Sequence, residues 1–126
     1  MKMTKLSEIY VCEICGNRVI VDKIGAGTLV CCGQNMILLE EKREDIGKEK
    51  HKPVIIFEEN KIIVKVGEIP HPMEEAHYIE FIELLKNNYI IARSQLKPYE
   101  KPEAVFYITD KNIRVRILCN IHGLWT

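Results

Sequence analysis

Four of the five cysteines lie within the first 32 residues, in a region too short to fold on a hydrophobic core alone. Below about 40 residues a chain usually needs a metal ion, a disulfide or a partner chain to hold a structure. The region carries two pairs of thiols, Cys12-x-x-Cys15 and Cys31-Cys32. Four paired thiolates indicate a tetrahedral site for zinc or iron, so residues 1–38 are predicted to form a small metal-bound domain.

The cysteine spacing alone favours zinc, with iron as the other interpretation. Paired Cys-x-x-Cys ribbons commonly hold structural zinc, whereas iron in the same four-thiolate site would be redox-active. A dithiol redox pair is a third interpretation, but it leaves the second pair of cysteines unexplained. The adjacent Cys31 and Cys32 must splay their side chains to reach one ion, and we expect this to distort the tetrahedron.

The composition of the 126-residue chain excludes several other classes of protein. Acidic and basic residues balance at 18 each, so the net charge gives no general attraction to nucleic acid or to an anionic membrane. No apolar run approaches the roughly 18–20 residues that span a bilayer, and the N-terminal "MKMTKLSEIY" lacks the apolar core of a signal peptide. We therefore expect a cytoplasmic protein with reduced thiols.

A highly charged stretch at residues 39–50 separates the cysteine-rich region from a strand-rich region at residues 51–126. We interpret this stretch as a linker that ends in the start of an active-site loop. Beyond it, segments rich in β-branched and aromatic residues alternate with turn signals, which predicts an antiparallel β-sandwich. These segments are 53–59, 61–67, 88–94, 104–110 and 112–119.

One segment of the second region has an ambiguous pattern. In "EEAHYIEFIELLKNN" (74–88), Tyr78, Phe81, Ile82 and Leu85 form a single helical stripe. Periodicity alone therefore predicts a helix. A strand that is buried on both faces produces a similar apolar run.

The four histidines and the remaining cysteine form a second candidate metal site. The histidines all lie after residue 50, and three of them are close to prolines or a glycine, which suits a rigid, preformed site. Four imidazoles and one thiolate suit a redox-active metal and leave a sixth octahedral position open to a substrate; iron(II) fits best, and copper is the alternative. The candidate ligands are His51, His71, His77, Cys119 and His122.

Six motifs, taken together, resemble those of the desulfoferrodoxins, the two-domain class of superoxide reductases. They are "YVCEICG", "LVCCGQNM", "GKEKHKPVI", "HPMEEAHYIEFIELL", "KPEAVF" and "CNIHGLW", in order and at matching spacing over nearly the whole chain. The resemblance implies a mainly β protein with a desulforedoxin-like domain followed by an immunoglobulin-like antiparallel β-sandwich. It also implies that "HYIEFIELL" is a strand, and we prefer this to the helix.

The resemblance further implies a catalytic mechanism, in which one electron from iron(II) and two protons convert superoxide to hydrogen peroxide. One iron ion would bind the four N-terminal cysteines. The other would have the four histidines in its equatorial plane and Cys119 as the axial ligand. Because superoxide is an anion, the positive charge of Lys50 next to His51 would attract it. In the family, a glutamate at the place of Glu49 can occupy the sixth position of the oxidised iron. The family also implies a rubredoxin-like electron donor and a homodimer.

Two other classes of protein remain open from the residues alone. A cupredoxin-type electron-transfer protein also combines a sandwich with a late Cys…His pair. No methionine follows Met73 to act as its weak axial ligand, however, and two histidines would be surplus. A zinc-stabilised binding module leaves the histidine set unexplained. The terminal "CNIHGLWT" is interpreted as a chain end held by the metal, with Trp125 at the edge of the site.

Overall fold

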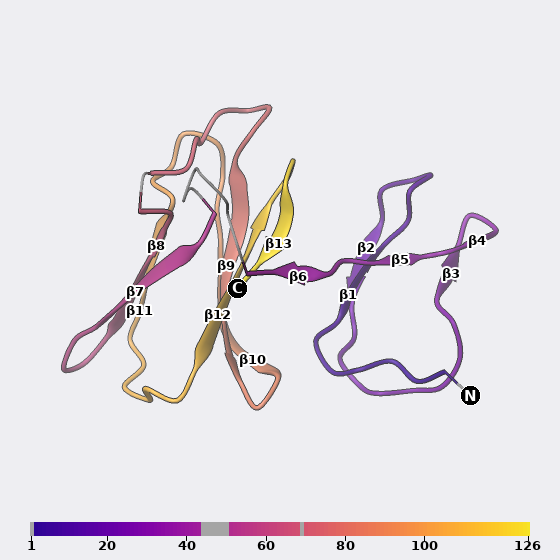
Figure 1. Cartoon of the computed structure of the whole chain (residues 1–126), viewed down its shortest axis with the longest axis horizontal. Coiled ribbons are helices and arrows are strands. Elements are labelled where there is room, and N and C mark those ends of the chain that lie inside the picture. Colours follow the sequence, from indigo (N-terminus) through magenta and orange to yellow (C-terminus); the bar gives the residue numbers. More distant parts are fainter. Residues whose placement is uncertain (1, 44–50, 69) are drawn as a thin grey trace. The chain divides into compact units, whose positions relative to one another are not determined.

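The computed structural model describes residues 2–43, 51–68 and 70–126, and these ranges contain strands and turns but no helix (Figure 1). The chain divides into two compact units, Met1–Glu40 and Glu41–Thr126. Each unit has its own sheets. The mainly β fold expected from the sequence is confirmed. The described part of the chain holds no helix that is long and apolar enough to cross a membrane.

The first unit combines a three-stranded antiparallel sheet, with the order β2-β1-β5, and a small hairpin of β3 and β4. Its buried apolar side chains are few, with Ile9, Tyr10, Cys12 and Val21 the only ones in its described part. This small core agrees with the expectation that the unit needs a metal. The strands are β1 (Ile9–Val11), β2 (Arg18–Ile20), β3 (Val30–Cys31), β4 (Gln34–Asn35) and β5 (Ile37–Leu38).

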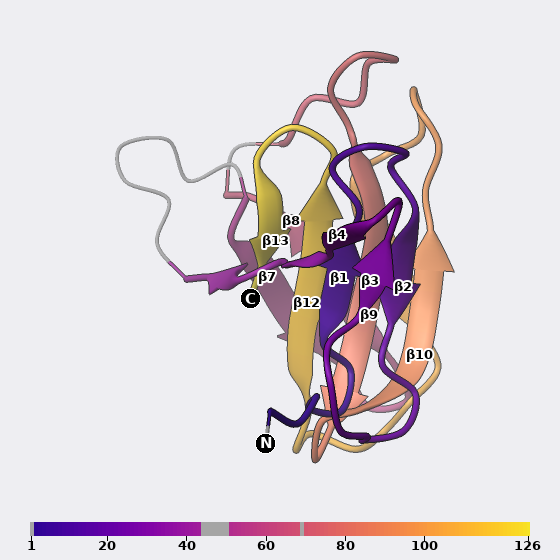
Figure 2. The ribbon, with the colours of Figure 1, turned by 90° about the vertical axis from the view of Figure 1, so that its right-hand side faces the viewer.

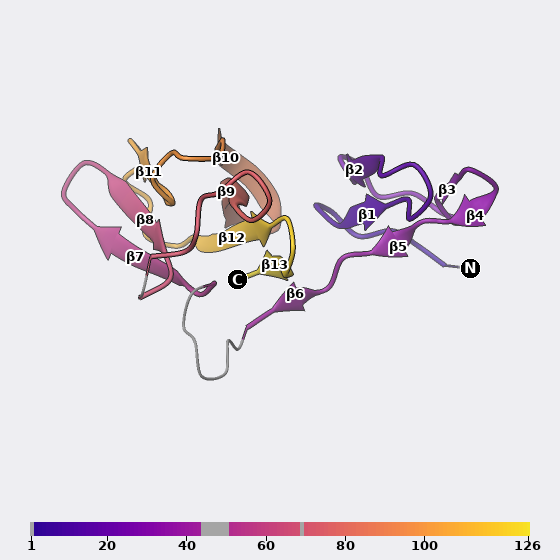
Figure 3. The same cartoon turned by 90° about the horizontal axis from the view of Figure 1, so that it is seen from above.

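The second unit is a sandwich of a five-stranded sheet, β10-β9-β12-β13-β6, and a three-stranded sheet, β11-β8-β7. Figure 3 shows the two sheets as two layers. All pairings in these sheets are antiparallel except that of β13 with β6. The strands are β6 (Glu41–Lys42), β7 (Pro53–Phe57), β8 (Ile62–Val66), β9 (Ile79–Lys86), β10 (Tyr89–Gln95), β11 (Glu103–Phe106), β12 (Arg114–Cys119) and β13 (Gly123–Trp125).

The predicted linker, residues 39–50, passes from the first unit into the second at Glu41. Glu41 and Lys42 form β6, which runs parallel to β13 with Glu41 opposite Leu124 and Lys42 opposite Trp125. Two residues are too few to show a strand period, so the sequence could not indicate this pairing. Residues 44–50 of the same stretch lie outside the described residues.

The helix that periodicity alone predicted in 74–88 is wrong, because Ile79–Lys86 form β9, an interior strand of the larger sheet between β10 and β12. Figure 2 shows β9 as a long ribbon beside β10. All five residues from Phe81 to Leu85 are buried. Ile82 and Leu84 belong to the core between the sheets, and Phe81 and Glu83 alternate with them onto the opposite face. A strand buried on both faces loses its polar alternation and therefore imitates a helical stripe.

The core of the sandwich is built from alternate residues of the central strands. On β12, Val115, Ile117 and Cys119 all belong to this core, so Cys119 lies on the apolar face of its strand. Each fully buried aliphatic side chain of this kind contributes about 1.5–3 kcal/mol. Further members of the core are Ile62, Val64, Val66, Leu96, Ala104, Phe106 and Trp125.

Candidate metal centres

The four cysteines of the first unit converge on one point. Their sulfur atoms all lie within 4.8 Å of one another. The Sγ atoms of Cys15 and Cys31 are 3.5 Å apart, and those of Cys31 and Cys32 are 3.9 Å apart. All five cysteines of the chain are free of disulfides. The structure thus assembles the four-thiolate site that the spacing predicts.

Two tight turns bring these thiols together. At Gly16 (φ 79°) the backbone N–H donates to the carbonyl of Cys12 at 2.9 Å, and the N–H of Asn17 donates to Cys15 Sγ at 3.4 Å. Cys32 has φ 52°, a left-handed conformation that is uncommon for residues other than glycine and that re-aims its side chain. The backbone N–H of Cys15 lowers the pKa of the Cys12 thiol to about 7, which favours the metal-binding thiolate.

The histidine–cysteine cluster of the second unit (His51, His71, His77, Cys119 and His122) has its donor atoms within 4.8 Å of one another. The imidazoles form a closed ring in which each is next to two others. The centroids of neighbouring rings are 4.7 Å apart from His51 to His71, 4.8 Å from His71 to His77, 4.9 Å from His77 to His122 and 4.7 Å from His122 to His51. Cys119 Sγ lies 3.7 Å from Nδ1 of His122. The arrangement can surround one ion with five donors.

The five residues of this cluster come from chain segments that meet at one end of the sandwich. His51 lies just before β7, whose start pairs with the end of β8. His71 and His77 lie in the connection from β8 to β9. Cys119 ends β12 opposite the start of β9, and His122 lies in the turn that leads to β13. Antiparallel pairing therefore assembles ligands that are up to 71 residues apart in sequence.

The tautomer and the protonation state of His71 suit a metal ligand. Its Nδ1 lies 2.7 Å from the carbonyl oxygen of Pro72, so the Nδ1–H donates there and Nε2 keeps a lone pair. Nε2 is buried and makes no hydrogen bond within the described residues. A metal ion would satisfy this atom. Burial lowers the pKa of His71 to about 4, which keeps the imidazole in its neutral, ligating form.

Cys119 is enclosed by the turn that follows it and is only 1% exposed. The backbone N–H of His122 donates to the Sγ atom of Cys119 at 3.4 Å. Burial raises the pKa of the Cys119 thiol, and the amides of His122 and Ile121 oppose that shift. A bound cation would add to this opposition and favour the thiolate.

Trp125 and Lys42 complete the surroundings of the cluster. The indole of Trp125 stacks on His51 with 4.6 Å between ring centroids and an angle of 10°, and its Nε1–H donates to the carbonyl of His122 at 3.2 Å. Nζ of Lys42 donates to the same carbonyl at 2.7 Å. The sequence indicated Trp125 at the edge of the site but missed Lys42, because only the pairing of β6 with β13 brings this lysine there.

The structure thus gathers the nine predicted ligands into two clusters. The two predicted catalytic residues, Glu49 and Lys50, lie outside the described residues. The two clusters differ in exposure: Cys15 and Cys32 of the first are exposed, whereas His51, His71 and Cys119 of the second are buried.

Comparisons with known proteins match both units of the chain. The family described as "Desulfoferrodoxin, N-terminal domain" matches residues 4–39, and the family "Desulfoferrodoxin" matches residues 43–126.

A desulfoferrodoxin homolog of Archaeoglobus fulgidus is 52% identical over 123 residues, which cover 98% of each chain. A superoxide reductase of Pyrococcus abyssi is 38% identical over 102 residues, which cover 67% of this chain and 89% of that protein. The crystal structure of the superoxide reductase from Treponema pallidum has a similar fold, with a TM-score of 0.72, 22% identity and 94% of each chain covered. The chain therefore belongs to the desulfoferrodoxin family.

Proposed function

We propose that the protein is a superoxide reductase that holds two iron ions and reduces superoxide to hydrogen peroxide at the second. The observation that carries this proposal is the closed ring of four imidazoles with one buried thiolate beside it. This donor set suits a redox-active metal, and five protein ligands leave one octahedral position for a small anion. The superoxide reductase that is 38% identical to the chain supports the same activity.

In this proposal each cluster binds one iron, and the two donor sets differ in chemistry. Four thiolates make a closed site that suits electron storage or a structural role. Imidazoles with one thiolate make a site that a substrate can reach. The ligands of the first iron are Cys12, Cys15, Cys31 and Cys32, and those of the second are His51, His71, His77, His122 and Cys119.

The residues around the second cluster suit a one-electron reduction. When bound there, iron(II) supplies the electron, and two protons complete the peroxide. The N–H that His122 donates to Cys119 moderates the electron density that the sulfur gives to the metal. His122 is exposed and His77 is half-buried, so this side of the ring is open to solvent and to a small anion.

Further parts of the proposal rest on the family resemblance. Lys50 would attract superoxide, and Glu49 would act as a further ligand of the iron once it is oxidised. An electron donor of the rubredoxin type would supply the electron that restores iron(II). We also propose that the protein is a cytoplasmic homodimer.

The cupredoxin-type alternative is not favoured. Such a copper site would use two of the four histidines, whereas all four lie in one ring. Met73, the last methionine of the chain, packs against the core, and its sulfur accepts the backbone N–H of Ile79 at 3.4 Å. The methionine that such a site would need is therefore already engaged elsewhere.

Metal analysis combined with superoxide-driven oxidation of the reduced protein tests the proposed function. We expect two irons per chain, and we expect superoxide to oxidise the second iron and yield peroxide without dioxygen. Zinc alone, or dioxygen formed in step with peroxide, would contradict the proposal.

In the same assay, Lys50→Ala should slow the capture of superoxide by a factor that shrinks at high salt. A deficit that is independent of salt would count against an electrostatic role of Lys50.

A further inference from the structure

Lys42 is a cation next to the second cluster that the proposed function does not use. Its Nζ donates to the carbonyl of His122 at 2.7 Å and lies 5.3 Å from the ring centroid of Trp125. A Cβ atom built on Gly123 would be 3.6 Å from the same Nζ. The ammonium group of Lys42 therefore lies against the turn that carries the candidate ligand His122, next to the carbonyl oxygen of that residue.

Backbone pairing holds Lys42 at this place. Lys42 lies opposite Trp125 in the register of β6 and β13, and its carbonyl accepts the N–H of Thr126 at 2.9 Å. Because Trp125 also donates to the carbonyl of His122, one peptide oxygen receives two donors from adjacent strands. The pairing of β6 with β13 therefore fixes the backbone of Lys42, and the hydrogen bond to His122 fixes its ammonium group.

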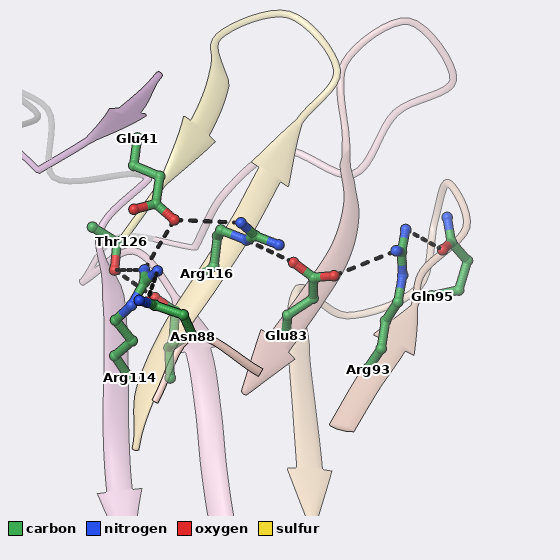
Figure 4. Close-up of polar contacts among 9 residues, drawn as sticks. Glu41, Glu83, Asn88, Arg93, Gln95, Arg114, Arg116 and Thr126 are labelled. Atoms are coloured by element: carbon green, nitrogen blue, oxygen red, sulfur yellow. Dashed lines mark hydrogen bonds and ion pairs between the residues drawn. The ribbon is translucent and has the colours of Figure 1, made fainter. Parts of the chain in front are cut away.

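The neighbouring Glu41 anchors β6 to the rest of the sheet, as Figure 4 shows. Its carboxylate accepts a hydrogen bond from Nη1 of Arg114 at 2.9 Å and lies 3.5 Å from Nη1 of Arg116. Nε of Arg116 donates to Glu83 at 2.8 Å, and both of these residues are buried. Charged groups with buried, ordered partners rigidify the elements that carry them. These contacts connect β6 to β12 and β9, two interior strands of the same sheet.

We propose that Lys42 is a positioning residue that tunes the second iron centre, by holding the carbonyl of His122 and by keeping a positive charge beside the turn between Cys119 and His122. This inference rests on the proposed function, because it requires iron in that cluster. Oxidation adds one positive charge to the centre, and a nearby cation disfavours that state by Coulomb repulsion. Lys42 therefore raises the reduction potential and favours iron(II), the form that reacts with superoxide.

Redox titration of the second centre in the complete two-iron protein tests the role of Lys42. Lys42→Met and Lys42→Gln both remove the charge, and Gln retains a hydrogen-bond donor. Both variants should lower the midpoint potential of the second centre. At a given applied potential, the ratio of oxidised to reduced iron should rise about threefold. At 59 mV per tenfold change, this corresponds to a shift of about 28 mV in the midpoint potential. Lys42→Glu should lower the potential further, and Lys42→Arg should keep it near that of the wild type. Because Lys42 is exposed, the shifts should shrink at high salt.

Lys111→Met is the matched control. Lys111 is also exposed, and it lies before the start of β12, whereas Cys119 lies at the end of that strand. Its removal changes the net charge equally and should leave the potential unchanged. An equal shift in this variant would overturn a specific role for Lys42.

Iron content, measured first, separates the two proposals. Absence of a second iron from the wild-type protein contradicts the proposed function itself. Full iron content with an unchanged potential in Lys42→Met overturns only the inference about Lys42. Equal shifts in Lys42→Arg and Lys42→Met would also overturn the inference, because a charge effect must distinguish these two variants.

Discussion

The second cluster depends on individual side chains that are oriented by contacts outside the cluster. Nδ1 of His71 is engaged by the carbonyl of Pro72, and the ring of His51 is stacked on Trp125. Such contacts fix the tautomer or the plane of an imidazole before a metal arrives. The ring of imidazoles is therefore preorganised, and its partners should influence metal retention without touching the metal.

Substitution of Trp125 tests this preorganisation. Trp125→Ala should lower the free energy of unfolding by about 3–5 kcal/mol and accelerate iron loss, because it removes core volume and the stack on His51. Trp125→Phe keeps an aromatic face but lacks the N–H that donates to His122, so both effects should be smaller. Urea unfolding and the rate of iron transfer to a chelator measure these effects.

Phe106→Ala provides the control for the loss of core volume. Phe106 and Trp125 are equally buried, at 7% exposure each, but Phe106 pairs with Ile62 at the end of β8 that is remote from the cluster. Phe106→Ala should lower the free energy of unfolding by a similar amount to Trp125→Ala. Under conditions where both variants stay folded, Phe106→Ala should lose iron more slowly. Equal rates of iron release would show that the stack has no role of its own.

At the scale of elements, a buried charge network joins the strands of the larger sheet. Glu83 on β9 lies directly opposite Arg93 on β10 and Arg116 on β12. Its two oxygens accept hydrogen bonds from these guanidinium groups at 3.3 Å and 2.8 Å (Figure 4). Cross-strand partners on both sides explain how a fully buried carboxylate is tolerated in a central strand.

Removal of one member of this network should be costly. Glu83→Gln takes from the buried Arg116 its 2.8 Å carboxylate partner, leaves it the longer 3.5 Å ion pair with Glu41, and should lower the free energy of unfolding by about 3–5 kcal/mol. The double variant Glu83→Leu with Arg116→Met removes both charges and should recover much of that loss. Chemical unfolding of the iron-loaded proteins measures both values.

Glu58→Gln is the matched control for the loss of a carboxylate. Glu58 forms an ion pair with Lys61 at 3.7 Å, and the two side chains are 45% and 33% exposed. Exposed pairs of this kind are worth at most about 1 kcal/mol. If Glu83→Gln were as mild as this control, the buried network would not be a major source of stability.

At the scale of the whole molecule, each of the two compact units contains one complete set of predicted metal ligands. No predicted ligand of one cluster comes from the other unit. Each site therefore has all of its donors within one folded unit, and the two sites should be separable by substitution.

Single ligand substitutions test this separation. Cys15→Ser should reduce the iron content from two to one per chain and remove the absorption of the first centre, with the second unchanged. Cys119→Ser should remove the visible absorption of the second centre and leave the first intact. Metal analysis and absorption spectra of both variants check the result, and loss of both irons in either variant would contradict independent sites.

Much of the fold was predictable because burial leaves a periodic trace in the sequence. The residues of β7, β8, β10, β11 and β12 all fall largely within segments predicted from their β-branched and aromatic content. Other strands lie outside those segments, and two of them show the physical reasons. β9 is buried on both faces and lacks alternation, so only the family resemblance indicated a strand, and β6 is too short to have a period.

The sequence by itself determined the two donor sets, because only sulfur and imidazole nitrogen provide these ligands and every cysteine and histidine of the chain belongs to one cluster or the other. The tertiary structure alone decided what surrounds them. Lys42 reaches the carbonyl of His122 because β6 pairs with β13, and Glu83 meets Arg116 because β9 pairs with β12. Residue type alone decides which atoms can bind a metal. The charges and hydrogen bonds around a ligand depend on strand register, because register brings together residues that are far apart in sequence.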